Sequence, residues 1–268
     1  MDRAGLRPVL LVRLSGTPLG ADPPIAPGRA PFAVIFRTII RLCGRYVPGP
    51  GRPRLPSNTL TAPPASRIVD HRGVLQRLAG RDRVELELGC GSSKRHPEAI
   101  GIDELDLPGV DLVGDVFDVL AAFPDGTVHT VRSFHFFEHV DDLPRLLAEV
   151  ARVLKTGGEL YLVTPHFSNP YFYSDYTHKR TFGLYTFAYL AQCRLFARQV
   201  PMYGVTPEFE VVDVTLGFKS ARPFYVRYAV KRAIGAVVNL GRWTQEFWEE
   251  NLCWLSPAYE IAYTLRKL

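Results

Sequence analysis

The pattern of hydrophobic and polar positions changes near residue 67. From there on, short apolar runs rich in β-branched residues alternate with segments whose apolar positions recur at helical spacing. The expected strands are 84–88, 99–103, 110–114, 127–134, 159–165, 209–218 and 260–268, and the main expected helices are 141–155 and about 226–240. Strands that alternate with helices predict crossover connections and a mostly parallel α/β sheet that helices cover on both faces.

The helix expected over 141–155 has recognisable ends. Asp141 or Asp142 can cap its first turn, because a carboxylate accepts hydrogen bonds from backbone N–H groups that have no partner within the helix. Gly157 and Gly158 follow the last apolar position, and we expect them to end the helix.

The first part of the chain has a different texture. Residues 1–30 and 47–66 are rich in Pro, Gly, Ala and Arg, and such sequence buries too little apolar surface to offset the entropy lost on ordering. We therefore expect a largely irregular N-terminal extension over 1–66 and a folded domain over 67–268. A chain of 268 residues with 47% hydrophobic content is long enough for one such domain with a substantial core.

Basic charge is concentrated near the N-terminus. Up to Arg83 the chain holds 14 Arg, no Lys and 4 acidic residues, whereas the remainder is mildly acidic. An Arg-rich arm favours nucleic acid as a partner, but the absence of Lys favours a compositional bias, so we expect no stable nucleic-acid partner. The apolar run 31–44, interrupted by Arg37 and Arg41, predicts a short basic helix that contacts a membrane surface or an acidic partner, or packs on the main domain.

Cysteine usage and the length of the apolar runs limit the class of protein. The four cysteines, Cys43, Cys90, Cys193 and Cys253, form no C-x-x-C pair and have no histidine at zinc spacing, so we expect neither a disulfide framework nor a metal site. The apolar runs are shorter than the roughly 20 residues that span a bilayer. These features predict a reducing, cytoplasmic setting.

The stretch VELELGCGSSK, 84–94, is the first candidate for chemistry. An apolar strand leads into Gly89 and Gly91, which allow a tight turn and a close approach to a ligand, with free backbone N–H groups expected to face it. The third glycine of a dinucleotide fingerprint is absent, and Glu87 places a carboxylate at the mouth of the turn. A carboxylate repels pyrophosphate and attracts an ammonium group, so the sequence predicts a ligand that is cationic at this end.

Two further acids follow expected strands. Asp103 ends the second strand, where a carboxylate can accept two hydrogen bonds from a ribose diol. Asp115 follows the third strand and can accept a hydrogen bond from the exocyclic amine of a base, although either acid alone is typical of a cap or turn residue. Because ligands of parallel sheets bind at the carboxyl ends of the strands, the ordered series of acids predicts a nucleotide site at that edge.

The whole set of motifs resembles the class I S-adenosylmethionine-dependent methyltransferases, closest to the small-molecule type 11 group. The set comprises VELELGCGSSK, AIGIDEL, VDLVGDV, FPDGTVHTVRSFHFFEHV and LLAEVARVLKTGGELYLVTPH. The resemblance runs from about residue 80 to the C-terminus, and its most specific parts are the E-x-G-x-G loop and the pair EHV and RVLKTGG. It implies S-adenosylmethionine as cofactor. It also implies a Rossmann-like, doubly wound, mostly parallel sheet in which 209–218 and 260–268 form a C-terminal antiparallel hairpin.

The resemblance implies a role for each residue of the cofactor site. Glu87 faces the methionine ammonium group directly or through water, while the methionine part is wrapped by Gly89, Cys90 and Gly91. Asp103 holds the ribose hydroxyls. The adenine is contacted by Asp115 and the backbone of Val116, and Ser133 lies beside the sulfonium.

The chain departs from the family pattern next to the loop. Ser93 stands in place of a third glycine that is often found there. Only eight residues, 92–99, separate Gly91 from Ile100 of the second strand, so the first helix must be very short.

The acceptor side is expected to follow the fourth and fifth strands. An aromatic-rich insertion at about 166–205 begins with nine aromatic residues in the 25 positions of 166–190. His135 and His178 are the candidate general bases, because imidazole titrates near neutral pH. His178 lies in SDYTHKRTF, which resembles a D-P-T-H-x-R element in some of these methyltransferases, whereas His139 is expected to cap a helix or pack on the sheet.

The sequence predicts methyl transfer to a small-molecule or cell-envelope precursor acceptor. An oxygen or carbon acceptor is favoured, because the N-x-P-P-Y type signature of amino-group and base methyltransferases is absent after the fourth strand. Two alternatives stay open: a nucleic-acid-binding protein or RNA methyltransferase that uses the basic N-terminal arm, and an inactive methyltransferase-like binding protein. A nicotinamide dehydrogenase is disfavoured by the missing third glycine and by Glu87.

Overall fold

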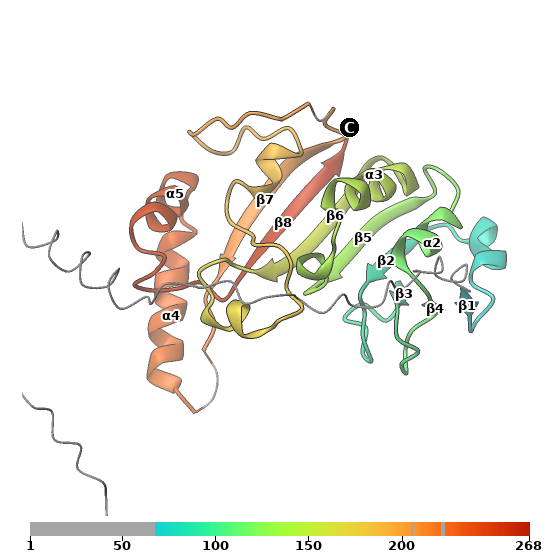
Figure 1. Ribbon diagram of the computed structural model, residues 1–268, viewed down its shortest axis with the longest axis horizontal. Coiled ribbons are helices and arrows are strands. Elements are labelled where there is room, and N and C mark those ends of the chain that lie inside the picture. The colour runs from blue at the N-terminus through green and yellow to red at the C-terminus, as the bar shows by residue number, and fades with distance from the viewer. Residues whose placement is uncertain (1–67, 205, 221–222) are drawn as a thin grey trace, which may run out of the picture. The chain divides into compact units, whose positions relative to one another are not determined.

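The computed structural model describes residues 68–204, 206–220 and 223–268 (Figure 1). The irregular extension expected over 1–66 and the basic helix expected over 31–44 lie outside the described residues. Within these residues, no helix combines the length and the apolar character that crossing a bilayer requires.

The described residues build one sheet of eight strands in the order β1-β4-β3-β2-β5-β6-β8-β7. The strands are β1 (Val69–Asp70), β2 (Glu85–Leu88), β3 (Ile100–Asp103), β4 (Leu112–Val113), β5 (Val128–Phe134), β6 (Leu154–Pro165), β7 (Phe209–Gly217) and β8 (Glu260–Lys267). The five central strands β2 to β6 are parallel, and β8 is antiparallel to both β6 and β7. The expected α/β sheet with a C-terminal antiparallel hairpin is therefore confirmed.

Four α-helices accompany this sheet: α2 (Val116–Ala121), α3 (Leu143–Val153), α4 (Tyr225–Val238) and α5 (Arg242–Asn251). Short 3-10 helices are η1 (Leu75–Gly80), η2 (Phe137–His139), η3 (Pro170–Ser174) and η4 (Thr186–Tyr189). Helices α2 and α3 contact each other, and α3 also contacts β6. Helices α4 and α5 lie together beside β7, at the end of the sheet opposite β1 (Figure 1).

The core lies between α3 and the central strands. The apolar positions of α3 that recur at helical spacing, including Leu146 and Val150, are fully buried, as are Leu86 of β2, Val131 of β5 and Leu160 of β6. Each side chain of this kind stabilises the fold by about 1.5–3 kcal/mol on burial. The hydrophobic pattern therefore fixes how the sheet packs against α3. It thereby also fixes which ends of the strands form the site.

Helix α3 begins as expected and ends earlier than expected. The carboxylate of Asp142 accepts a hydrogen bond from the N–H of Arg145, which confirms the cap. The prediction that Gly157 and Gly158 end the helix is wrong, because the helix ends at Val153 and β6 begins at Leu154. Leu154 pairs with Val128 of β5, so strand pairing replaces the last helical turn, and the two glycines fall in a register shift of the sheet.

The connection from β2 to β3 contains no helix. We expected a very short helix there, but residues 92–99 form turns and bends. A crossover between parallel strands usually takes a dozen or more residues, and this one has too few for a helix to pack back on the sheet. Two buried charged side chains, Glu87 and Asp111, fix the loop instead.

Candidate functional site

The carboxyl ends of the parallel strands bring the expected site residues to one edge of the sheet. Strand β2 leads into Gly89 and Gly91, both in the left-handed region with φ of 64° and 58°. A Cβ atom at Gly89 would lie 2.6 Å from the Cβ atom of Phe136, whereas a Cβ atom at Gly91 would have no atom within 4 Å. Gly89 is therefore required by the packing of the loop, while Gly91 faces open space that a side chain would fill.

The backbone N–H groups of this loop are not free to bind an anion. Those of Gly89 and Cys90 donate to the carbonyl of Ile102 at 2.9 and 3.2 Å, and that of Gly91 donates to Oδ2 of Asp103 at 2.8 Å. Our expectation of free N–H groups facing the ligand is therefore wrong. A dinucleotide loop holds pyrophosphate through such groups, so this geometry reinforces the exclusion of a pyrophosphate ligand.

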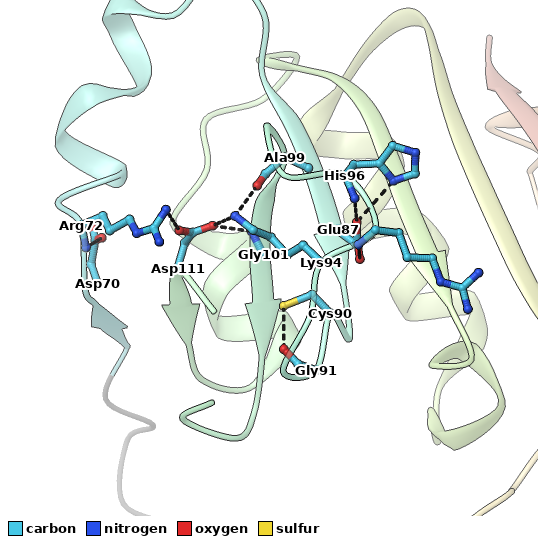
Figure 2. Close-up of polar contacts among 11 residues, drawn as sticks. Asp70, Arg72, Glu87, Cys90, Gly91, Lys94, His96, Ala99, Gly101 and Asp111 are labelled. Carbon is cyan, nitrogen blue, oxygen red and sulfur yellow. Dashed lines mark hydrogen bonds and ion pairs between the residues drawn. The ribbon is translucent and has the colours of Figure 1, made fainter. Parts of the chain in front are cut away.

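Glu87 lies beneath the loop and not at its mouth. Its side chain is 2% exposed, and its two carboxylate oxygens accept hydrogen bonds from the N–H groups of Arg95 and His96 at 2.9 and 3.0 Å (Figure 2). A buried carboxylate is tolerated when its oxygens accept such bonds. Glu87 thus orders the connection that lacks a helix, and it lies in β2 two residues before the glycine turn.

Lys94 and Asp111 form the second anchor of this loop (Figure 2). The Nζ atom of Lys94 lies 2.6 Å from Oδ2 of Asp111 and donates to the carbonyl of Ala99 at 2.9 Å. Asp111 is 3% exposed and also accepts a hydrogen bond from the N–H of Gly101. A Cβ atom at Gly101 would come within 2.7 Å of the Lys94 side chain, so this glycine makes room for the lysine.

The structure brings Asp103 to the glycine turn and keeps Asp115 close to its own helix. Asp103 ends β3, and its carboxylate accepts from the N–H groups of Gly91 and Leu105. Asp115 is exposed and caps α2 by accepting a hydrogen bond from the N–H of Phe117. Val116 begins that helix. Asp115 therefore caps a helix, which was the alternative role expected for it, and Oδ1 of its carboxylate accepts this hydrogen bond.

Neither Ser133 nor Cys90 lies in the surroundings of a reactive side chain. Ser133 is 1% exposed, and its hydroxyl donates to the carbonyl of Leu88 at 3.3 Å. Burial, together with the nearby charges of Asp103 and Glu87, raises the pKa of the Cys90 thiol to about 12. The thiol therefore stays protonated, and the same two carboxylates favour a positively charged ligand at the turn.

His135 follows β5 in a strained conformation between two carboxylates. Its φ is 57°, the left-handed region that non-glycine residues rarely adopt. Its Nδ1 lies 3.5 Å from Oε1 of Glu138, and its Nε2 lies 3.6 Å from Oε2 of Glu260, which begins β8 at the same edge of the sheet. The close contacts with the carboxylates of Glu138 and Glu260 raise the pKa of His135 to about 9, so the imidazole is protonated near neutral pH.

Two motifs that are distant in the sequence meet on the acceptor side. The carbonyl of Glu138 accepts hydrogen bonds from the N–H groups of Lys179 and Arg180, so 177–180 lies against 137–140. The ring centroids of His139 and His178 are 4.9 Å apart. His135 and His178, the two candidate bases, therefore both lie near the residues of η2.

The aromatic stretch before His178 is divided between core and surface. Phe172 is buried and packs on the His178 ring at 4.8 Å, whereas Tyr171, Tyr173 and Tyr176 are exposed. His166 is fully buried and bonded to Glu249 of α5 at 3.0 Å, which ties the insertion to that helix. The tyrosines thus form no part of the core, and Phe172 supports the histidine.

Sequence reasoning missed the partners that hold the site together. Asp111 carried a signal, because it is a charged residue within an otherwise apolar run. Glu138 carried a signal in the sequence only as part of the EHV motif. Its burial depends on residues 177–180, about forty positions later. The only signal for Lys94 was its place next to Ser93, where the third glycine of the family pattern is absent.

The residues at the turn fit S-adenosylmethionine. The open space beside Gly91 is bordered by the carboxylate of Asp103, and the charges of Asp103 and Glu87 act on the neighbouring Cys90, so a ligand with an ammonium group and hydroxyl groups is complemented. The N–H groups of Gly89, Cys90 and Gly91 are bonded within the protein and do not hold a phosphate.

Comparison with known proteins adds a family match. The family model of the methyltransferase domain matches residues 95–162, which run from the loop after Gly91 into β6. No curated protein matches the sequence. Among solved structures, the chain is similar to an S-adenosylmethionine-dependent methyltransferase from Archaeoglobus fulgidus, with 21% identity, 72% of this chain and 93% of that chain covered, and a TM-score of 0.45.

Two further solved structures are similar at lower identity. Geranyl diphosphate C-methyltransferase from Streptomyces coelicolor is 15% identical, with 73% of this chain and 77% of that chain covered and a TM-score of 0.38. Phosphoethanolamine N-methyltransferase 2 from Haemonchus contortus is 14% identical, with 72% of this chain and 51% of that chain covered and a TM-score of 0.38.

The chain therefore contains a segment, 95–162, that is similar to the methyltransferase domain. The resemblance found in the sequence is confirmed. The family model indicates a methyltransferase, and we propose S-adenosylmethionine as its cofactor.

Proposed function

We propose that the protein transfers the methyl group of S-adenosylmethionine to an oxygen or carbon atom of a small-molecule or cell-envelope precursor. The observation that carries the cofactor half of this proposal is the glycine turn, whose N–H groups are all bonded within the protein while carboxylates border and underlie it. Such a turn suits the ammonium group of the cofactor. The acceptor half is supported by the histidines and carboxylates that follow β5 and β6.

Each cofactor residue except Glu87 takes its expected role in this proposal. Glu87 does not face the ammonium group, because its carboxylate is buried and bonded; it acts through the loop that it holds and through its negative charge. The methionine part lies against Gly89, Cys90 and Gly91. Asp103 accepts from the ribose hydroxyls, with Asp115 and the backbone of Val116 beside the adenine and Ser133 beneath the sulfonium.

His178 is the better candidate for the general base. Its Nδ1 lies 2.9 Å from the carbonyl of Phe172, and because a carbonyl only accepts, Nδ1 carries the proton and Nε2 keeps a lone pair. His135 has a pKa of about 9 and is a cation near neutral pH, so we propose that it donates a hydrogen bond to the acceptor. The variant His178→Gln should lose turnover and retain cofactor affinity; unchanged turnover would remove this role.

Helix α4 favours an acceptor at a membrane surface. Its side chains Tyr225, Val226 and Val230 are 68%, 80% and 52% exposed, and Arg227 and Arg232 lie among them. The sequence from 214 to 245 contains no acidic residue. An exposed helix with apolar and basic side chains binds anionic lipid surfaces, which supports a cell-envelope lipid or lipid-linked precursor as acceptor.

Vesicle flotation tests this part of the proposal. The protein should float with phosphatidylcholine vesicles that contain phosphatidylglycerol and remain behind with phosphatidylcholine alone. The double variant Val226→Ser with Val230→Ser should weaken binding about tenfold, since two half-exposed apolar side chains are lost. Val69→Ser, an exposed valine at the other end of the sheet, is the control; equal loss in the control, or no flotation of the unaltered protein, would contradict membrane binding.

The acceptor itself is found by labelling. The protein is incubated with S-adenosylmethionine that carries a labelled methyl group and with a cell extract separated into lipid, small-molecule, nucleic-acid and protein fractions. We expect label in the lipid or small-molecule fraction, and none with an Asp103→Asn variant. Label in the nucleic-acid fraction would favour the alternative that uses the basic N-terminal arm.

A further inference from the structure

Three potential metal ligands converge on the acceptor side. A carboxylate oxygen of Glu138, a ring nitrogen of His139 and a ring nitrogen of His178 all lie within 4.8 Å of one another. Two imidazoles and a carboxylate are a donor set that zinc and other first-row divalent ions take in proteins. The backbone holds the two segments together through the bonds from Lys179 and Arg180 to the Glu138 carbonyl.

The carboxylate of Glu138 is the strongest indication of a cation. Glu138 is 1% exposed, and neither of its side-chain oxygens has a hydrogen-bond partner among the described residues. Nδ1 of His135, at 3.5 Å, is at the limit of a hydrogen bond. Buried charges in proteins are paired, hydrogen-bonded or coordinated to a metal, and an ion bound by Glu138 would satisfy this group.

Both histidines are fixed in the tautomer that a metal ligand needs. His178 donates through Nδ1 to the carbonyl of Phe172, which leaves Nε2 as the ring nitrogen available to a metal. Nδ1 of His139 lies 3.0 Å from the hydroxyl oxygen of Thr177, whose proton is directed to Asp175 at 2.6 Å. His139 therefore also donates through Nδ1 and keeps a lone pair on Nε2.

These outer hydrogen bonds are typical of metal sites. A histidine that binds a metal almost always donates its other ring N–H to a carbonyl, a carboxylate or water, which fixes the ring. The Oδ2 atom of Asp175 lies 3.5 Å from Nε2 of His178 and adds negative charge beside the cluster. His139 and His178 are partly exposed while Glu138 is buried, so an ion can enter from the side of the histidines.

We propose that Glu138, His139 and His178 bind one divalent transition-metal ion, of which zinc suits the donor set best. The inference rests on the proposed function and narrows it to oxygen acceptors. An ion with three protein ligands keeps a position for a hydroxyl, carboxylate or phosphate oxygen of the acceptor. His178 then serves as a ligand of the ion that orients the acceptor, and this role replaces the general-base role proposed for it.

The sequence predicted no metal site because none of its cysteines has a histidine at zinc spacing. The three ligands proposed here include no cysteine. They come from two segments that approach each other only in the folded chain.

Direct metal binding tests the proposal without relying on turnover. The full chain is freed of metal with a chelator, dialysed, and titrated with Co²⁺ by visible absorption and with Zn²⁺ by calorimetry. We expect one ion per chain. The variants Glu138→Gln and His178→Gln should each weaken binding by at least about tenfold, as loss of metal-site residues commonly does. The control His71→Gln removes an imidazole outside the cluster and should bind the ion as the unaltered protein does.

If a variant of a proposed metal ligand fails to fold, a variant that removes an outer hydrogen bond of the site still tests the proposal. Thr177→Val removes the hydroxyl that orients His139 and should weaken Co²⁺ binding while leaving the fold intact. S-adenosylmethionine affinity is measured on the same preparations, so that failure of the cofactor site is recognised separately. Absence of Co²⁺ and Zn²⁺ binding in a protein that binds the cofactor, or binding unaffected by Glu138→Gln and Thr177→Val, would overturn the proposal.

Discussion

The two sides of the site differ in how their polar groups are satisfied. On the cofactor side, the carboxylates of Glu87 and Asp103 each accept two backbone hydrogen bonds, and the N–H groups of the glycine turn are all bonded. On the acceptor side, the carboxylate of Glu138 has no hydrogen-bond partner among the described residues, and His135 has a strained backbone. The comparison indicates that the cofactor side is built in advance, while the acceptor side keeps polar groups for a ligand.

The largest expected effect concerns the two glycines of the turn. Gly89→Ala forces a side chain into a left-handed backbone and into Phe136, so we expect a loss of about 2–5 kcal/mol in the free energy of unfolding. Gly91→Ala meets no atom and should cost only about 1 kcal/mol of backbone strain, yet it fills the space proposed for the cofactor. Urea unfolding and cofactor titration separate the two effects. Unaltered cofactor affinity in Gly91→Ala would contradict the proposed location.

Asp103→Asn tests the acid at the end of β3. We expect S-adenosylmethionine affinity to fall at least about tenfold, since a hydrogen bond to a charged group contributes about 1.5–3 kcal/mol. Asp106→Asn, an exposed acid three residues later, is the matched control and should retain affinity. Equal affinity in both variants would show that Asp103 only shapes the loop.

A pair of carboxylate-to-amide variants tests the comparison itself. Glu87→Gln places an amide NH₂ against a backbone N–H and should lower the free energy of unfolding by about 1–3 kcal/mol. Glu138→Gln removes no hydrogen bond and relieves a buried charge, although it weakens the contact with His135, so we expect a change within about 1 kcal/mol. A larger loss in Glu138→Gln than in Glu87→Gln, measured by chemical unfolding, would reverse the comparison.

The smallest expected effect is a pH dependence at His135. Its pKa rises from an ordinary value of 6.5 to about 9 on folding, chiefly through the close contact with the carboxylate of Glu138. The resulting stabilisation is fully present below pH 6.5 and is lost as the pH rises through 9. Relative to His135→Asn, which tolerates the backbone, the unaltered protein should lose about 1 kcal/mol across this window, because partial exposure screens the charges. A constant difference between pH 6 and 10 would contradict the pairing.

The sequence predicted the sheet better than it predicted the site. Strands such as 84–88 and 127–134 were found because a buried strand shows its apolar pattern locally, and the approach of Asp103 to the glycine turn follows from parallel strands ending at one edge. The end of α3 was misplaced because strand pairing at Leu154 outweighed the local glycine signal. The surroundings of Glu138 escaped prediction, since they depend on a segment about forty residues away.

Calorimetric titration with two ligands tests the central claim, that the glycine turn takes a ligand with an ammonium group and not a pyrophosphate. The unaltered protein is titrated with S-adenosylmethionine and, in parallel, with NAD. We predict saturable binding of S-adenosylmethionine at one site per chain and no saturable binding of NAD. Saturable binding of NAD, or a folded protein that does not bind S-adenosylmethionine, would contradict the account.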